Sequence, residues 1–456
     1  MSTSPPPHQV DNETTQSKPS TSLGSVEEKV VERAQGPPEL PNGGLRAWCT
    51  VLGGFLLQFC CGGYSVSFGV YQGEWTVDPK VLDVRFSDMV IQTSTFGNSL
   101  PTLLLRPFPG GVIAGRLYDR GYFYWLLYGG SLLTVFSLFM LSLAKPNHYY
   151  QVFLSHGIGA GLGVGMTYVP SIAITAQYFS TRRALAMTTI ATGASIGSIV
   201  HPIMLNNTLG SLGFANAVRA STGMIAGLLL IACCLMKTRT TVKKQASGSS
   251  KTVLKGISKD PAYITATVGL MILSIGLYFP LFYIQLDAVK HNLNETFAFY
   301  SLVILNFANV LGRIIPGFLA YTFGVANMIT ASALICSAVT FAMIGLKDEI
   351  GVVFIALIYG FVIGAIISLM GPLIVLLTSD ISELGARMGI AYFFSGIAGL
   401  IGTPIAGALL TKDFIWWRPA VFSGATSLVG GAFYILMLII LRRKKSRAES
   451  RATDSS

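Results

Sequence analysis

Long apolar segments recur along almost the whole of this chain, and they constrain its fold more than any other feature. From Arg46 onward these segments alternate with short polar connections. A helix of about 20 residues spans the hydrocarbon of a bilayer and satisfies its own backbone hydrogen bonds there. The sequence therefore predicts twelve transmembrane helices, at 47–71, 88–113, 122–144, 149–177, 184–206, 214–236, 262–286, 297–320, 327–346, 351–378, 388–410 and 418–441.

The composition excludes several other classes of protein. Apolar residues make up 52 % of the chain and charged residues only 12 %, about half the roughly 25 % of soluble domains. A soluble enzyme, a disulfide scaffold and a disordered protein are therefore excluded. The six cysteines include the adjacent pairs Cys60–Cys61 and Cys233–Cys234 and have no CxxC spacing. We interpret them as packing residues, and we expect no metal site and no cofactor.

The basic residues lie in connections between the apolar segments. The net charge is +11, and because residues 1–45 carry three basic and six acidic side chains, the remainder stands at +14. A nucleic-acid partner would need these charges on one folded face, so none is expected. Lys and Arg concentrate in cytoplasmic loops, which places both termini in the cytosol and predicts a multi-pass protein of the plasma membrane. The cytoplasmic set comprises Arg116, Arg120, Arg182, Arg183, seven basic residues from Lys237 to Lys259, and Arg442, Arg443, Lys444, Lys445 and Arg447.

The chain divides into two halves of six predicted spans. Gly115-Arg-Leu-Tyr-Asp-Arg-Gly121 follows the second span, and a degraded counterpart, Gly317-Phe-Leu-Ala-Tyr-Thr-Phe-Gly324, follows the eighth. Parallel six-helix repeats of this kind bind substrate between them near the bilayer midplane. We expect an all-α membrane protein with a disordered cytoplasmic tail at 1–45, bundles at 46–236 and 261–441, a basic cytoplasmic linker at 237–260 and a basic cytoplasmic tail at 442–456.

The first loop motif resembles that of the major facilitator superfamily. The match is Gly115, followed by Asp119, Arg120 and Gly121. The resemblance implies two pseudo-symmetric six-helix bundles and a cytoplasmic latch. In such a latch, the acid lies at the N-terminus of a neighbouring helix and an arginine pairs across the bundle.

Three further segments resemble the monocarboxylate porter family, particularly its fungal branch. They are Pro41-Asn-Gly-Gly-Leu-Arg-Ala-Trp48, Tyr178-Phe-Ser-Thr-Arg-Arg-Ala-Leu-Ala186 and Asn306-Phe-Ala-Asn-Val-Leu-Gly-Arg313. The second contains Arg182 and Arg183, which we group with the loop motif as candidate gating residues. The chain departs from the animal proton-coupled members, because its first span has no lysine and Asn309 stands where they carry an acid.

Arg313 is the leading candidate for substrate binding. It lies inside the eighth predicted span, where a charged side chain is costly unless it faces a cavity or a partner. Asn306 and Asn309 share its helical face. A guanidinium with two amides suits a carboxylate or another oxygen-rich substrate. Arg106, in the second span among Pro101, Pro107 and Pro109, could bind substrate or satisfy carbonyls that those prolines free.

Weaker signals surround these candidates. His156 and His201, in the outer parts of the fourth and fifth spans, could carry a coupled proton or could simply pack. Asn294 begins a glycosylation sequon in a predicted outer loop. Glycines in the fourth span, among them Gly159 and Gly163, predict close helix packing. Aromatic residues that could line a cavity are Tyr168, Tyr278, Phe279, Tyr283, Tyr392 and Phe393.

The favoured function is secondary active transport of a small organic anion or polar metabolite by alternating access, acting as a monomer. Export of a fungal secondary metabolite competes with import of a monocarboxylate or vitamin. The missing acid and lysine, with the aromatic interior, favour a larger metabolite and efflux. A membrane enzyme would need clustered His, Cys or acidic residues inside the spans, which the sequence does not present. A non-transporting nutrient sensor is the remaining alternative.

Overall fold

The computed structural model describes residues 43–66, 111–145, 148–239, 256–281, 283–284, 295–346, 348–410 and 415–454. In the N-terminal half the helices are α2 (Leu45–Val66), α6 (Gly111–Asp119), α7 (Phe123–Leu141), a segment formed by α8 (Tyr149–Val152), η1 (Phe153–Ala160), α9 (Gly161–Ala173) and η2 (Ile174–Gln177), and α10 (Arg183–Leu235). In the C-terminal half they are α12 (Pro261–Gly276), α14 (Glu295–Phe323), α15 (Val325–Ala342), η3 (Met343–Gly345), α16 (Glu349–Leu377), η4 (Ile381–Glu383), α17 (Leu384–Leu410) and α18 (Trp417–Asp454).

The helices confirm the all-α membrane fold. Ten of the described helices are long and apolar enough to cross a membrane. One of them, α10, covers both the fifth and the sixth predicted spans. Its chain reverses at Gly213, whose φ of 70° and ψ of 164° are not helical and are accessible because glycine lacks a Cβ. Most of the second predicted span, 88–113, lies outside the described residues. Helix α6 overlaps its last three residues and continues to Asp119, so most of the loop motif, expected as a connection, is helical.

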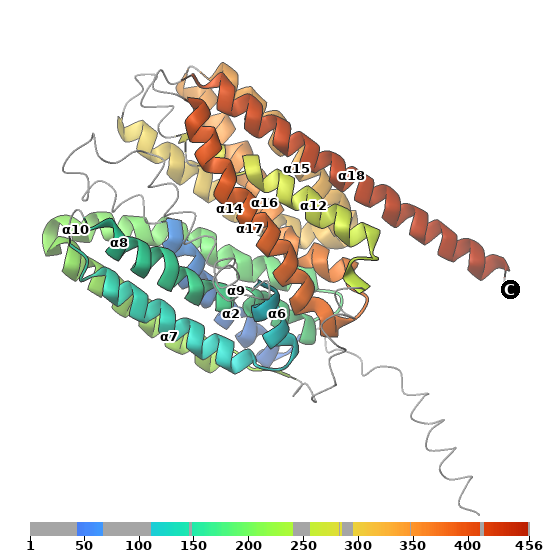
Figure 1. The fold of residues 1–456 in the computed structure, drawn as a ribbon, viewed down its shortest axis with the longest axis horizontal. Helices are drawn as coiled ribbons and strands as arrows, with labels where there is room; N and C mark the ends of the chain where they lie inside the picture. Colours follow the sequence, from blue (N-terminus) through green and yellow to red (C-terminus); the bar gives the residue numbers. More distant parts are fainter. Residues whose placement is uncertain are drawn as a thin grey trace, which may run out of the picture. The chain divides into compact units, whose positions relative to one another are not determined.

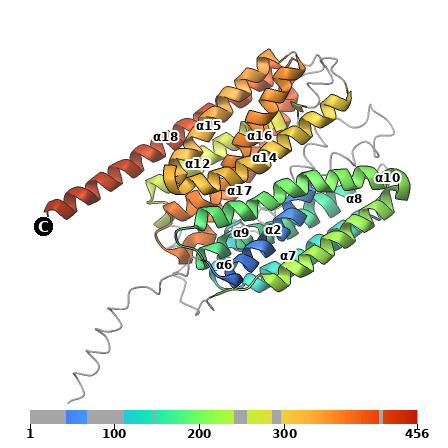
Figure 2. The same ribbon diagram turned by 180° about the vertical axis from the view of Figure 1, so that it is seen from behind.

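The two halves pack as related bundles. Figures 1 and 2 show the helices of the N-terminal half on one side and those of the C-terminal half on the other. In the first half α10 packs against α2, and in the second α17 packs against α12. Both packings depend on glycine, since a Cβ on Gly197 would strike the Phe59 carbonyl and one on Gly402 the Ile275 carbonyl. Gly159 and Gly163 lie as closely against α7, which confirms the expected tight packing of the fourth span.

The halves meet mainly where α10 contacts α14 and where α17 contacts α6, and less extensively where α10 contacts α16 and α17 contacts α9. All six cysteines are free, as expected from their spacing. The described residues contain no group of three or more His, Cys, Asp or Glu able to hold a metal ion. The last helix, α18, continues through the basic tail to Asp454.

Candidate functional site

Arg313 joins the two halves at the centre of the molecule. It lies on α14 about 15 Å from the end at Phe323, at 1.5 Å per residue. Its Nε donates a hydrogen bond to Asn309 Oδ1 at 2.9 Å, and its Nη1 donates to the carbonyl oxygen of Ala191 on α10. Ser195 Oγ, one turn along α10, donates to the same Asn309 oxygen at 2.7 Å. We call Arg313, Asn309, Ser195 and the Ala191 carbonyl the arginine centre.

The guanidinium of Arg313 has no acidic partner among the described residues. Its relative exposure is 8 %, and its hydrogen-bond acceptors are an amide and a carbonyl. A second buried arginine, Arg387, is neutralised instead by Asp260 at 3.0 Å and Glu383 at 3.5 Å. A buried charge without a counter-charge is costly. The arginine centre therefore has an unused capacity to bind an anion.

Tyrosines from other helices surround this centre. Tyr168 on α9 and Tyr278, just after α12, lie within electrostatic range of the guanidinium. The ring of Tyr392 on α17 meets that of Tyr168 edge-on, with centroids 5.3 Å apart. Of the aromatic residues expected to line a cavity, these three gather here. The others pack locally, Phe279 against Tyr283 and Phe393 against Phe394.

Asn306 also lies on the buried face of α14, as its spacing predicts, with 6 % relative exposure. Its side-chain amide donates to the Leu302 carbonyl at 3.0 Å. It is therefore engaged within its own helix, one turn from Asn309. Both asparagines and Arg313 share the face that the sequence predicted.

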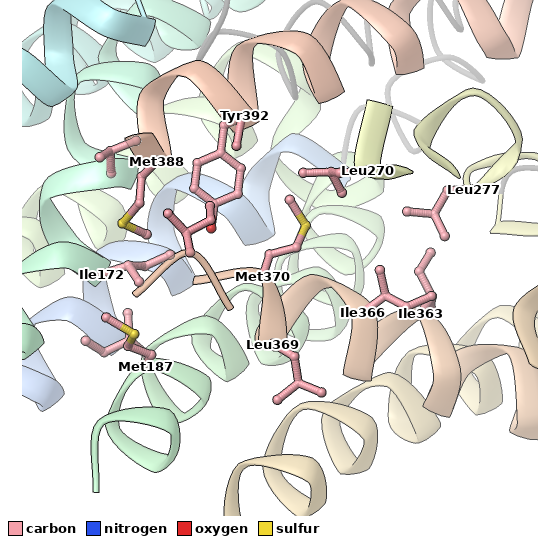
Figure 3. Close-up of a cluster of buried hydrophobic side chains, with 14 of the residues drawn as sticks. Ile172, Met187, Leu270, Leu277, Ile363, Ile366, Leu369, Met370, Met388 and Tyr392 are labelled. Carbon is pink, nitrogen blue, oxygen red and sulfur yellow. The ribbon is translucent and has the colours of Figure 1, made fainter. Parts of the chain in front are cut away.

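An apolar layer separates the arginine centre from the loop motif. It consists of Ile172 on α9, Met187 on α10, and Gly371 and Met388 on α16 and α17, some of which Figure 3 shows. A Cβ on Gly371 would lie 3.0 Å from Ile172 Cγ2 and 3.5 Å from Met388 Cε. Along α10, Met187 is one turn nearer the loop motif than Ala191. This methionine layer, drawn from both halves, packs across their contact on the loop-motif side of the arginine centre.

The loop motif closes the same end in a second way. The two carboxylate oxygens of Asp119 accept hydrogen bonds from the backbone N–H groups of Gly385 at 2.9 Å and Ala386 at 2.8 Å. These are unpaired donors at the N-terminus of α17, where the helix dipole favours a negative charge. Gly115 lies so close that a Cβ would strike the Gly385 carbonyl. The expected acid-to-helix contact is confirmed, and we call it the Asp119 latch.

Arg120 is exposed and makes no ion pair within the described part of the chain, so the arginine part of that expectation stays a prediction. Burial raises the pKa of Asp119 to about 7, against an ordinary 3.8, and its two N–H donors act in the opposite direction. Gly121 adopts a φ of 89° and Gly324 one of 78°, which supports the pairing of the two loop motifs.

The counterpart of the latch in the second half is open. Gly317 packs against Thr188, but Tyr321, which stands where the acid would be, is 84 % exposed. A cavity of about 600 Å³ lies between the end of α14 and the start of α10, and exposed Arg182 lines it. Arg183 instead donates from Nε to the Phe179 carbonyl. Of the two candidate gating arginines, Arg182 therefore lies beside this cavity and Arg183 is bonded within its own segment.

The two candidate histidines lie together away from the arginine centre. Tyr64 on α2 separates them, with ring centroids 5.9 Å from His156 and 5.5 Å from His201. His201 Nε2 bonds the Phe59 carbonyl at 3.1 Å, and its Nδ1 has no partner among the described residues. His156 lies in η1, a stretch of π-helix, a geometry often found at functional sites. The structure thus places both histidines in one buried cluster.

Two candidates, Arg106 and Asn294, lie outside the described residues. Sequence reasoning missed the role of Asp260, which pairs with Arg387 and also caps α12 by accepting from the Tyr263 N–H. The signal was present, since Asp260 directly precedes Pro261, and an acid followed by proline is typical of a helix start. The pairing with Arg387, 127 positions away, was not accessible from local sequence.

The chain is similar to known membrane transport proteins over most of its length. Residues 50–379 match the family model described as Major Facilitator Superfamily. The chain is 32 % identical to the aspyridones efflux protein apdF of Emericella nidulans, over 89 % of this chain and 81 % of that protein. It is 33 % identical to the fujikurins efflux protein of Gibberella fujikuroi, over 90 % of this chain and 86 % of that one.

Solved structures agree on the fold. The human organic anion transporter MFSD10 superposes with a TM-score of 0.66 at 15 % identity, covering 88 % of this chain and 100 % of that one. The transporter FucP in its outward conformation gives the same TM-score at 14 % identity, with 85 % and 98 % coverage.

Proposed function

This chain belongs to the Major Facilitator Superfamily, and from that premise we propose that it exports an anionic or oxygen-rich secondary metabolite from the cytosol. The observation that carries the proposal is the buried, uncompensated guanidinium of Arg313 at the contact between the two halves. Family membership makes the chain a transmembrane transporter. The chemistry of the arginine centre selects the class of substrate.

The arginine centre favours an oxyanion for a physical reason. Arg313 presents a fork of donors that matches a carboxylate or enolate, and its present acceptors, Asn309 and the Ala191 carbonyl, are neutral groups that an anion would replace favourably. The rings of Tyr168, Tyr278 and Tyr392 add hydroxyls and flat apolar surface. This combination suits a ring-bearing acid better than a small aliphatic one.

Alternating access follows from the arrangement of the closed end. The methionine layer and the Asp119 latch both lie between the arginine centre and the loop-motif end. We place that end in the cytosol, because the basic connections lie there, with both termini on the same side and the protein in the plasma membrane. Export then requires the latch and the layer to separate so that substrate can enter from the cytosol.

Efflux is favoured by the relatives. Two of those described above are named for the efflux of aspyridones and of fujikurins. A narrower membership in the monocarboxylate porter-like family rests on the motifs around Trp48, Arg183 and Arg313. Import of a monocarboxylate or vitamin is the competing function, and Asn309 in place of an acid weakens it.

We place a coupled proton on the cluster of His156, Tyr64 and His201. The support is a buried imidazole whose Nδ1 lacks a partner among the described residues, next to a second imidazole across Tyr64. If His201 carries this proton, His201→Gln abolishes acceleration of transport by a proton gradient while binding at Arg313 persists. Persistence of that acceleration would assign the proton elsewhere.

The function is tested by comparing metabolites in cells and medium with and without the intact gene in the native organism. Export predicts that an acidic or polyoxygenated compound disappears from the medium and accumulates inside the deletion strain. Reintroducing the wild-type gene should restore secretion, and reintroducing Arg313→Gln should not. Normal secretion together with failed uptake of a supplied carboxylate would instead establish import.

A further inference from the structure

A groove runs along the outside of the N-terminal bundle, away from the arginine centre. It lies between α7 and the second half of α10, which pack side by side (Figure 2). Its volume is about 870 Å³. Its lining is contributed by Tyr124, Tyr128, Ser131, Leu132 and Val135 of α7, by Ala226, Leu229, Leu230, Cys233 and Cys234 of α10, and by Met236 and Lys237.

The length of the groove corresponds to one leaflet of a bilayer. Its lining extends from Tyr124 to Val135 on one helix and from Ala226 to Lys237 on the other. At 1.5 Å per residue each run is about 16 Å long, and half of a hydrocarbon core of about 30 Å is 15 Å. The groove therefore starts at the loop-motif surface and ends near the bilayer midplane.

The chemistry of the lining changes along that length. At the surface end, Lys237 is exposed, and the rings of Tyr124 and Tyr128 stack with centroids 5.8 Å apart. At the deep end, Leu132 and Leu230 are 72 % and 67 % exposed. Tyrosine and basic side chains favour the headgroup level, and bare leucine favours the acyl chains. This order of polarity is that of a phospholipid.

We propose that this groove binds one phospholipid with an anionic headgroup from the leaflet on the loop-motif side. The headgroup lies against Lys237, and an acyl chain follows the leucines toward the midplane. The charge complementarity selects an anionic lipid over a zwitterionic one. Tyr124 is held in place because its hydroxyl accepts a hydrogen bond from the Thr238 N–H at 3.2 Å, so the surface end of the groove has a fixed shape.

The test is photo-crosslinking of the purified full-length protein in phosphatidylcholine vesicles. The probe is phosphatidylserine or phosphatidylcholine with a diazirine in the acyl chain, and cross-linked peptides are identified by mass spectrometry. We expect phosphatidylserine to label peptides of α7 and the end of α10, and unlabelled phosphatidylserine to compete. Lys237→Gln should lower the preference for phosphatidylserine about fivefold, since one basic residue near an anionic surface contributes about 1 kcal/mol.

Two further variants separate the groove from general membrane contact. Ala226→Trp fills the groove without changing charge and should remove labelling at α7 and α10 by both lipids. Lys145→Gln makes the same charge change at an exposed lysine beyond the other end of α7, and should leave the labelling unchanged. Three results would overturn the proposal. They are equal labelling by both lipids in the wild type, labelling that survives Ala226→Trp, and cross-links from the groove to residues 240–255 of the same chain.

Discussion

Replacing Arg313 by lysine tests how the arginine centre binds its substrate. The guanidinium donates in two directions, to Asn309 Oδ1 at 2.9 Å and to the Ala191 carbonyl. Lysine keeps the positive charge but concentrates it on one ammonium, which cannot present a planar fork to an oxyanion. The variant therefore isolates the geometry of the site from its charge.

The expected loss is one hydrogen bond to a charged group. Such a bond contributes about 1.5–3 kcal/mol, which raises the KM for an oxyanion substrate by about 10- to 150-fold. Arg313→Gln removes the charge as well and should abolish transport at any accessible concentration. The assay is the initial rate of ATP-independent uptake into inside-out plasma-membrane vesicles, measured against substrate concentration.

The control is Arg219→Lys, the same exchange at an exposed arginine of α10 that bonds Ser142 and Asn216. We expect its KM to match that of the wild type. An unchanged KM in an Arg313→Lys protein that reaches the membrane at normal abundance would refute the substrate-binding role. If the KM rose equally in the Arg219→Lys protein, the effect would not be specific to the arginine centre.

Three further predictions concern the closed end. Because burial raises the pKa of Asp119 to about 7 from 3.8, the closed latch is stabilised as pH falls and loses that stability as pH rises through about 7. The reporter is Met187→Cys, at a position 1 % exposed in the closed conformation. Its alkylation rate, corrected for the fraction of cysteine present as thiolate, should therefore slow about tenfold between pH 8 and pH 6, and Asp119→Asn should remove this dependence. Gly115→Ala places a Cβ against the Gly385 carbonyl, so the same reporter should react faster and transport should fall. Arg387→Gln leaves two partly buried carboxylates unpaired and should destabilise the protein by about 3 kcal/mol, measured as a lower thermal midpoint in detergent.

The helices could be predicted because each span satisfies its backbone within itself. In lipid this requirement makes the local composition decisive, and α7, α16 and α17 begin and end within four residues of their predicted limits. The deviations come from tertiary packing and turns. The seventh span was expected to be one helix to 286, but α12 ends at Gly276, a turn follows at Leu277 and Tyr278, and helix resumes at Phe279 within a span described to Leu281.

Only some of the residues of the arginine centre could be predicted from local sequence. Periodicity placed Asn306, Asn309 and Arg313 on one face, because helical spacing is a local property. It could not supply Ser195 as the partner of Asn309, since that hydrogen bond joins residues 114 positions apart. Nor could it separate the three tyrosines that meet at the arginine centre from the aromatic residues that pack locally, because that depends on the rotation of each helix.

The second loop motif has Tyr321 where the first has Asp119, and this difference makes the two sides of the closed end unequal. In a fully symmetric pair of bundles, opening the loop-motif end would break an acid-to-helix contact on each side. Here the Asp119 carboxylate holds α17, whereas the related gap beside Arg182 contains a cavity of about 600 Å³. Of these two places, only the first holds a carboxyl group against a helix N-terminus, so the pH dependence of opening is concentrated at one acid. Separation of α10 from α14 on the other side breaks the hydrogen bonds of Arg313 to the Ala191 carbonyl and of Ser195 to Asn309, which join the two halves at the arginine centre.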